Sequence, residues 1–213
     1  MRQIIQKLRS LFWRGHLHLV VRQAVVAAHI AQAPERSIAF FGDSRVEQAL
    51  LPAELNGLTV VNAGIGSATV GLLARILPSL LNGKKLAASV VSVGINNSKV
   101  VQTANEDFAQ SLSAICRYLE NHSDRVVLTT IPPALADAPL GLGYFDATKI
   151  DANNRTIQSV AQEHGLTVID LTSPMSDKTG ALRVGYSIDG VHFTPDGYSS
   201  WRDAINAKLK ELG

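Results

Sequence analysis

The sequence predicts an α/β fold in which a parallel sheet is covered by helices on both faces. Three observations support this prediction. From Ser37 onward, short apolar and β-branched runs recur along the chain, turn residues follow each run, and segments of helical periodicity separate one run from the next. Strands that are apolar throughout are typical of parallel sheets, which lie buried between two layers of helices.

Five runs predict the strands in chain order. They are 38–41 before Gly42, 59–62 before Gly64, 89–93 before Gly94, 125–130 before Pro132, and 167–170. The helices expected between and after them are at about 68–82, 104–121, 147–164 and 195–211. Gly and Pro cluster at 132–143, which we interpret as a loop over the sheet rather than as a domain linker. With 213 residues and no internal repeat, the chain suits one compact domain with a sizeable core.

Residues 1–36 predict a helical extension that precedes the main domain, 37–213. The extension carries Arg2, Lys7, Arg9, Arg14 and Arg22, and no acidic residue before Glu35. One helical face collects Ile4, Ile5, Leu8, Leu11 and Phe12, and Trp13 adds an aromatic ring typical of interfaces. Because Arg22 interrupts the apolar run 17–31, the uninterrupted part is too short to span a bilayer.

Three interpretations of this extension stay open. It can lie on an anionic membrane or a partner surface, it can be a signal peptide that ends at Ala31-Gln32-Ala33, or it can pack on the domain's own surface. Localisation is therefore open between the cytoplasm and the membrane or export.

Composition and charge argue against nucleic acid as a partner. The formal net charge is +2, and beyond residue 34 the chain holds 15 of its 20 basic residues against all 18 acidic ones, a net charge of −3. That part of the chain also lacks the interleaved basic and aromatic residues on which bases stack. Cys116 is the only cysteine, so no intrachain disulfide or cysteine-rich metal site can form, and its helical pattern favours a buried, small apolar residue.

The first group capable of chemistry follows the first strand, at Gly42-Asp43-Ser44. Ligands of such sheets bind at the carboxyl ends of the strands, and a serine after a tight glycine turn exposes its hydroxyl there. If a helix follows, the Ser44 N–H points to where an oxyanion would form. Ser44 is equally suited to cap that helix, with Glu47 completing a capping box, and on the tripeptide alone the cap is the simpler interpretation.

A base candidate precedes the last helix, at Asp189-Gly190-Val191-His192. An Asp three residues before a His can accept its Nδ1–H, which leaves Nε2 available as a base. The alternative is a solvated Asp beside a His packed on the helix start. His122 and His164 fall at predicted helix ends, where they suit the helix dipole, so His192 is the best base candidate after residue 36.

Two further turns at the same edge carry hydrogen-bond donors. The Asn96 amide, in Gly94-Ile95-Asn96-Asn97, can donate to an oxyanion, as can backbone N–H groups of the turn 62–67. Gly and Asn are also ordinary turn residues, so neither turn is specific alone. The Gly64-x-Gly66 pattern lacks a third glycine and the downstream acidic residue of a dinucleotide site, which argues against that function.

In their order and spacing, these blocks resemble the SGNH (GDSL-type) hydrolase superfamily over residues 38 to about 200. Gly42-Asp43-Ser44 is similar to its first block, Gly94–Asn97 to its third and Asp189–His192 to its last. The resemblance implies a three-layer α/β/α flavodoxin-like sandwich with a five-stranded parallel sheet. It also implies Ser44 as nucleophile, His192 as base and Asp189 as orienting acid. The oxyanion hole would use the Ser44 N–H, an N–H of the second block and the Asn96 side chain.

Two positions depart from the family pattern. Asn97 stands where the third block usually has Asp, a variant similar to the platelet-activating-factor acetylhydrolase catalytic subunits. The usual second-block glycine aligns with Ser67, and Gly66 precedes it by one residue. Because a backbone donor tolerates a change of side chain, activity is expected to persist, with the second donor open between Gly66 and Ser67.

The resemblance implies a carboxylic ester hydrolase that forms an acyl-enzyme on Ser44 and needs no metal or organic cofactor. Short acyl esters, including acetyl groups on carbohydrates, and lipid esters are the expected substrates. An acyltransferase on the same site and a non-catalytic binding module are the alternatives. We expect the apolar loop 132–146 to line an acyl pocket, to act as a lid or to pack on the sheet. Arg45 is expected to meet an anionic or sugar group or to form a surface salt bridge.

Overall fold

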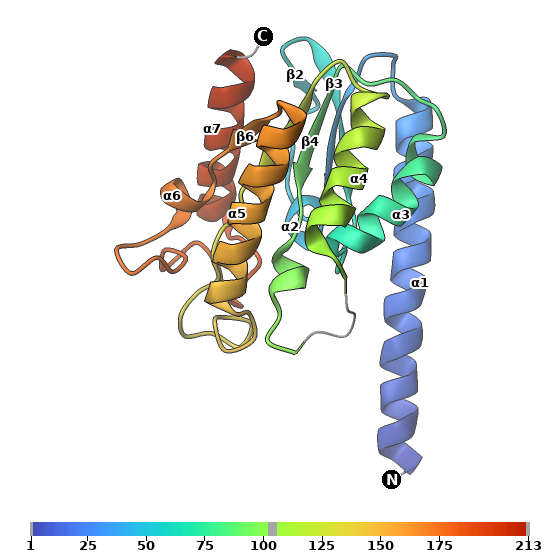
Figure 1. Ribbon diagram of the computed structural model, residues 1–213. Helices are drawn as coiled ribbons and strands as arrows, with labels where there is room; N and C mark the ends of the chain where they lie inside the picture. Colours follow the sequence, from blue (N-terminus) through green and yellow to red (C-terminus); the bar gives the residue numbers. More distant parts are fainter. Residues whose placement is uncertain (1, 102–105, 212–213) are drawn as a thin grey trace.

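The computed structural model describes residues 2–101 and 106–211, and side chains over 17–101 and 106–210. It confirms the α/β architecture, with one sheet between two layers of helices (Figure 1). The strands are β1 (Ile38–Gly42), β2 (Glu54–Leu55), β3 (Leu58–Gly64), β4 (Ala88–Ser92), β5 (Val126–Thr129) and β6 (Thr167–Ile169). Their order across the sheet is β2-β3-β1-β4-β5-β6.

The helices agree with the predicted periodicity. They are α1 (Arg2–Gln32), α2 (Ser44–Glu47), α3 (Val70–Leu81), α4 (Phe108–Glu120), α5 (Ala147–His164), α6 (Thr172–Met175) and α7 (Pro195–Glu211), with a 3₁₀ turn at Ile95–Ser98. Thr69 caps α3, and Asp107 caps α4, through side-chain acceptors for backbone N–H groups. The expected start of α4 at 104 falls outside the described residues.

The prediction of five parallel strands is wrong by one strand. β1, β3, β4, β5 and β6 are parallel, but the short β2 pairs antiparallel with β3, which makes the sheet six-stranded and mixed. Asn56 and Gly57 join β2 to β3 with φ values of 52° and 75°. Two consecutive positive φ values are typical of the tight hairpin turn that Asn-Gly favours, so the turn explains the additional strand.

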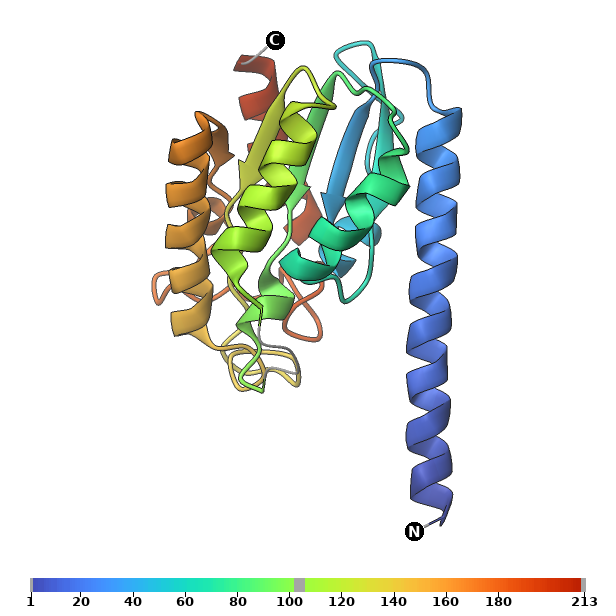
Figure 2. The same cartoon turned by 45° about the vertical axis from the view of Figure 1, so that its right-hand side comes forward.

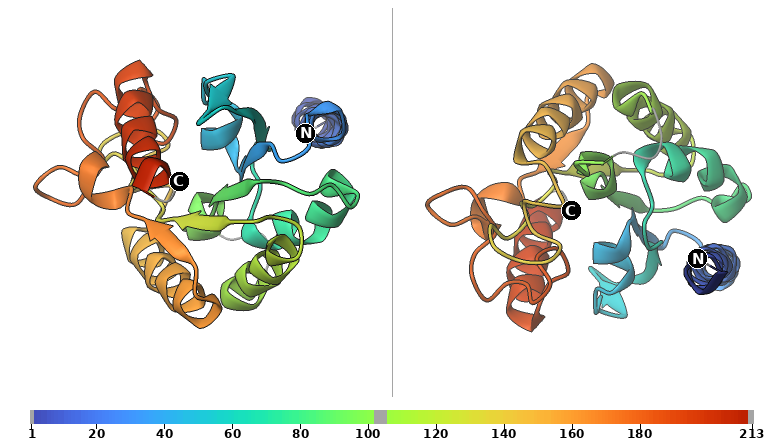
Figure 3. Two further views of the ribbon diagram at one scale, coloured as in Figure 1. Left: turned by 90° about the horizontal axis from the view of Figure 1, so that it is seen from above. Right: turned by 90° about the horizontal axis from the view of Figure 1, so that it is seen from below.

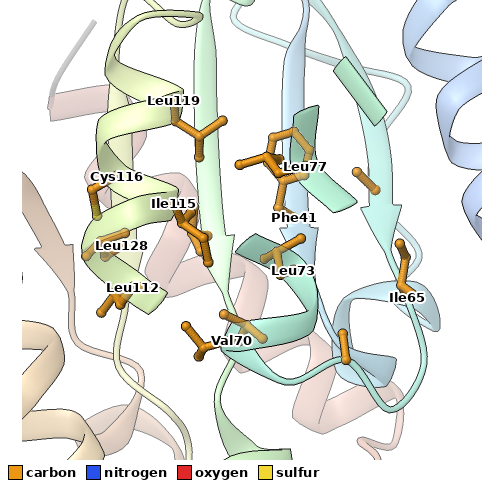
Figure 4. Close-up of a cluster of buried hydrophobic side chains, with 14 of the residues drawn as sticks. Phe41, Ile65, Val70, Leu73, Leu77, Leu112, Ile115, Cys116, Leu119 and Leu128 are labelled. Atoms are coloured by element: carbon orange, nitrogen blue, oxygen red, sulfur yellow. The ribbon is translucent and has the colours of Figure 1, made fainter. Parts of the chain in front are cut away.

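Two hydrophobic cores lie on opposite faces of the sheet. Helices α3, α4 and α5 cover one face, and α7 covers the other (Figure 2). Figure 4 shows the first core, where Phe41 of β1 meets Leu73 and Leu77 of α3. Cys116 of α4 is fully buried in this core, and burial raises the pKa of its thiol to about 12, which fits the predicted apolar role.

Helix α1 packs beside α3 and β3, at one side of the sheet (Figure 3). Val26 and Ile30 are fully buried in the first core. The N-terminal part of the helix projects past the carboxyl edge of the sheet (Figures 1 and 2). The side chains of the expected amphipathic face, Ile4 to Phe12, and of Trp13 lie outside the described residues. In the part of the chain that the structure describes, no helix combines the length and the hydropathy needed to cross a membrane.

Candidate active site

The turn after β1 presents Ser44 at the carboxyl edge of the sheet. Gly42 permits this turn, since a Cβ there would lie 2.3 Å from the Ser92 carbonyl oxygen and from Val46 Cγ2. Asp43, not Ser44, caps α2, because its carboxylate accepts the Arg45 N–H at 3.0 Å. The interpretation of Ser44 as the helix cap is therefore wrong. Its hydroxyl lies instead beside the predicted base.

Ser44, His192 and Asp189 form a continuous chain of hydrogen bonds. His192 Nε2 lies 2.9 Å from Ser44 Oγ, and His192 Nδ1 lies 2.5 Å from Asp189 Oδ2. The first of these distances joins residues 148 positions apart in the sequence. The arrangement is that of a serine nucleophile, a base and an orienting carboxylate.

Asp189 is held as a carboxylate by the turn that it begins. Its Oδ1 accepts the N–H groups of Val191 at 3.0 Å and His192 at 2.9 Å. Burial by itself raises the pKa of Asp189, but the hydrogen bonds from the His192 ring and from the two backbone N–H groups outweigh it and lower the pKa to about 2. Asp189 is therefore ionised at neutral pH, as an orienting acid requires.

The glycine-rich turn after β3 distinguishes its two candidate donors. The Gly66 N–H donates to Glu47 Oε2, so a protein acceptor already occupies it. Ser67 has a φ of 62°, a left-handed conformation that favours glycine and explains the usual residue of the second block. Among the described residues, neither the Ser67 N–H nor the Ser44 N–H donates to a protein acceptor.

Asn96 and Asn97 join the third block to the start of α3. Asn96 Nδ2 donates to the Ala68 carbonyl oxygen at 3.1 Å, which leaves its other amide hydrogen for a ligand. Asn97 Oδ1 accepts the Val70 N–H at 3.0 Å, and its Nδ2 donates to Glu106 Oε2 at 3.0 Å. Glu106 therefore supplies a carboxylate beside the position where the family usually has Asp.

Arg45 occupies neither of its two expected environments. Its side chain is buried, and it donates to the carbonyl oxygens of Val191 at 2.8 Å, Pro132 at 2.7 Å and Pro133 at 3.0 Å. The guanidinium also lies 4.7 Å from the centre of the Phe193 ring. Arg45 thus ties α2 to the segment that carries His192, which excludes both a surface salt bridge and a solvent-facing substrate contact.

The 132–146 loop packs on the domain and supports the Asp189 turn. Leu140 N donates to the Asp189 carbonyl oxygen at 2.8 Å, and Leu135 N donates to the Gly190 carbonyl oxygen at 2.9 Å. Gly190 has a φ of 108°, and a Cβ there would lie 2.6 Å from Gly141 N, so the close approach requires glycine. The loop therefore packs against the turn that carries Asp189.

The other described histidines of the main domain lie away from this site. His164 pairs with Glu120 at 3.0 Å, and the His122 ring stacks on Tyr118 with 4.2 Å between ring centres. Within the described residues, no group of three or more His, Cys, Asp or Glu side chains gathers as a metal site would require. Asp189 and His192 are thus the one pair that sequence and geometry both bring to Ser44.

Comparisons with known proteins identify the family of the chain. Residues 31–199 match the family model described as the GDSL-like Lipase/Acylhydrolase family. A search of curated proteins gives no match.

Solved structures share the fold at low sequence identity. A Streptococcus pneumonia protein named for platelet activating factor is 24% identical, with a TM-score of 0.79 over 98% of this chain and 99% of that chain. A GDSL-like lipase from Bacteroides thetaiotaomicron is 21% identical, with a TM-score of 0.73 over 90% and 98%. A catalytic mutant of an acetylxylan esterase from Geobacillus stearothermophilus is 16% identical, with a TM-score of 0.67 over 85% and 95%.

Proposed function

Because the chain belongs to the GDSL-like lipase/acylhydrolase family and is a carboxylic ester hydrolase, we propose that Ser44 is its nucleophile, His192 its general base and Asp189 its orienting acid. One observation carries the assignment. The hydrogen-bond chain from Asp189 Oδ2 through the His192 ring to Ser44 Oγ is unbroken, with distances of 2.5 Å and 2.9 Å. Asp189 fixes the ring with its proton on Nδ1, which directs Nε2 at the hydroxyl.

The proposed reaction has two halves. His192 Nε2 takes the proton from Ser44 Oγ as that oxygen attacks the ester carbonyl carbon and forms a tetrahedral intermediate. The carbon–oxygen bond to the alcohol then breaks, and the imidazolium gives its proton to the leaving oxygen. In the second half, water attacks the carbonyl carbon of the acyl-enzyme and gives a proton to His192 Nε2. The bond from that carbon to Ser44 Oγ then breaks, His192 returns the proton to Ser44 Oγ, and the carboxylic acid leaves.

The proposed oxyanion hole comprises the N–H groups of Ser44 and Ser67 and the second amide hydrogen of Asn96. The occupied Gly66 N–H favours Ser67 over Gly66 as the backbone donor of the second block. Each such donor contributes about 10²–10³ in rate in serine hydrolases.

The proposed substrates are short acyl esters, such as acetyl groups on carbohydrate, or lipid esters. The likeness in fold to an acetylxylan esterase and to a GDSL-like lipase supports both classes. A series of p-nitrophenyl esters of increasing acyl length distinguishes them, since kcat/KM falls with length for an acetylesterase and rises for a lipase.

The test of the nucleophile is Ser44→Ala, with Ser79→Ala as a matched control on the exposed side of α3. We expect Ser44→Ala to lose esterase activity and labelling by a fluorophosphonate, and Ser79→Ala to keep both. Wild-type activity in purified Ser44→Ala would refute the assignment. Product analysis with added sugar acceptors separates hydrolysis from acyl transfer, and a wild-type protein that neither turns over nor labels would indicate a binding module.

The outer face of α1 favours contact with an anionic membrane. Leu17, Val20 and Val21 are 63%, 51% and 51% exposed, and helical spacing places them on one face, away from the buried Val26 and Ile30. Residues 1–34 contain five basic residues and no acidic one, so their net positive charge complements anionic lipid.

Vesicle binding tests this membrane contact. We expect sedimentation with phosphatidylglycerol vesicles, loss of binding in Val20→Asn/Val21→Asn, and full binding in Val184→Asn, a variant of an exposed valine in a loop. Equal binding by all three proteins would contradict the proposal.

A further inference from the structure

We propose that α1 is part of the catalytic unit, with Arg22 as a positioning residue that holds the glycine-rich turn after β3 against the helix that carries Ser44. This inference rests on the proposed function, because it concerns the same oxyanion hole. It adds two residues of α1, Arg22 and His18, and one of α2, Glu47, to the groups that set the geometry of the reaction.

Arg22 fixes the backbone of the turn directly. Its Nε donates to the Gly64 carbonyl oxygen at 2.8 Å, and its Nη2 donates to the carbonyl oxygen of Asn62 at 3.2 Å and to Asn62 Oδ1 at 3.1 Å. The Asn62 amide in turn donates to the carbonyl oxygens of Val46 at 2.7 Å and Ala49 at 3.1 Å. The planar guanidinium therefore orients Asn62, which fastens the turn to α2.

Glu47 forms the second connection between the same three elements. It is the last residue of α2, three positions after Ser44, and its carboxylate accepts the Gly66 N–H. Glu47 Oε1 also lies 3.0 Å from His18 Nε2 and 3.9 Å from Arg22 Nε. The N–H of Gly66 immediately precedes that of Ser67, so the position of the Glu47 carboxylate sets where the proposed donor points.

Charge gives Arg22 a second effect on the reaction. The Glu47 carboxylate is only 18% exposed, and an unbalanced negative charge beside the oxyanion hole opposes the charge that develops in the transition state. Arg22, itself 17% exposed, balances that carboxylate. Removing the guanidinium both loosens the turn and takes away the positive charge that balances the Glu47 carboxylate.

Attachment of α1 alone does not explain these contacts. Val26 and Ile30 already anchor the helix in the core. A partly buried arginine is costly to desolvate, so a helix that only covers apolar surface gains nothing from Arg22 within its apolar run. Both Arg22 and His18 precede residue 31, where the match to the family begins, so the family pattern does not include them.

The experiment compares kcat and KM for p-nitrophenyl acetate in full-length Arg22→Ala, Arg22→Lys and Arg36→Ala. Arg36 is the matched control, because it is exposed and pairs with Asp124 at 3.2 Å. We expect Arg22→Ala to lower kcat about tenfold with KM within about twofold, since displacement of a preorganised donor acts on the transition state. Arg22→Lys should have a kcat between those of Arg22→Ala and the wild type. Lysine keeps the positive charge but lacks the planar set of N–H donors with which Arg22 binds Gly64 and Asn62.

Two variants of Glu47 keep the inference testable if Arg22→Ala folds poorly. Glu47→Ala frees the Gly66 N–H and should lower kcat about tenfold, whereas Glu47→Gln keeps an oxygen acceptor and should lose less. Because Arg22 and Glu47 act on one turn, the double alanine variant should lose no more than the worse single variant. Rates are normalised to the fraction of Ser44 that a fluorophosphonate labels.

The outcomes separate this inference from the proposed function. A normalised kcat for Arg22→Ala equal to that of Arg36→Ala, or for Glu47→Ala equal to wild type, would overturn the positioning role. Activity that persists in Ser44→Ala would instead overturn the proposed nucleophile and leave no basis for the inference.

Discussion

Replacing Arg45 with methionine should destabilise the protein by about 3 kcal/mol. Methionine matches the length of the arginine stem but donates no hydrogen bonds. In the wild type, the buried guanidinium donates to the carbonyl oxygens of Val191, Pro132 and Pro133 at 2.7–3.0 Å. The variant leaves these three carbonyl groups without that donor in a buried place.

The magnitude follows from two opposed effects. A buried acceptor that loses its partner costs about 1–3 kcal/mol, so three of them cost more than any single surface contact. Removing the charge recovers a desolvation penalty, which is visible in the pKa of Arg45, lowered to about 10 by burial. Three such acceptors together would cost about 3–9 kcal/mol, and the recovered desolvation of the charge places our expectation at the lower end.

Urea unfolding followed by tryptophan fluorescence, to which Trp201 contributes from its buried place beside Phe40 and Tyr198, gives the change in unfolding free energy. The matched control is Arg202→Met, which removes one exposed bond to the Leu50 carbonyl oxygen at 3.0 Å and should change stability by less than about 0.5 kcal/mol. The reasoning is refuted if Arg45→Met loses less than about 1 kcal/mol or matches Arg202→Met.

Three further predictions concern the site itself. Ser67→Gly should raise the unfolding free energy by up to about 1 kcal/mol, because glycine adopts the φ of 62° without strain, and kcat should stay within about twofold because the backbone donor remains; a large loss of kcat would instead assign a role to the Ser67 hydroxyl. Asp189→Asn should lower kcat about 10⁴-fold, as loss of the orienting carboxylate does in a serine triad. The folded-state pKa of Asp189, about 2, lies below its ordinary value of 3.8, so its carboxylate stabilises the fold above about pH 4, and this contribution is lost as pH falls toward 2. After allowance for its 38% exposure, about 1 kcal/mol should disappear over that window in wild type and not in Asp189→Asn, by urea unfolding at several pH values.

Local sequence patterns predicted most of the fold. The five parallel strands and the helices α3, α5 and α7 lie within about two residues of their predicted ranges, because apolar periodicity and turn residues mark them directly. β2 was missed although its signal was present. Asn56-Gly57 is a strong hairpin signal, but a two-residue strand is too short to show any alternation of apolar and polar residues.

In the candidate site, too, the sequence predicts the features that local patterns mark and not those that depend on tertiary contacts. Ser44, Asp189 and His192 are marked by their places after a strand and before a helix, so the sequence predicts that they lie close together, and in the structure they do. The environment of Arg45 could not be predicted from the sequence. Its three acceptors are backbone carbonyl groups, which every residue has, so no residue type in the sequence indicates them. The choice between Gly66 and Ser67 likewise depends on a carboxylate from another element, Glu47, which the sequence had suggested only as a capping residue.

The segments that carry the proposed catalytic groups are short, so side chains elsewhere in the fold are expected to set their positions. Ser44 stands on a helix of four residues, which is too short to be stable by its own hydrogen bonds. His192 and the proposed donor Ser67 stand on turns. Each of these segments therefore takes its position from a side chain elsewhere: Arg45 binds the His192 segment to α2, and Arg22 and Glu47 bind the Ser67 turn to α2. Loss of such a side chain displaces proposed donors and acceptors whose interactions with the substrate strengthen in the transition state, so its effect should fall on kcat rather than on KM.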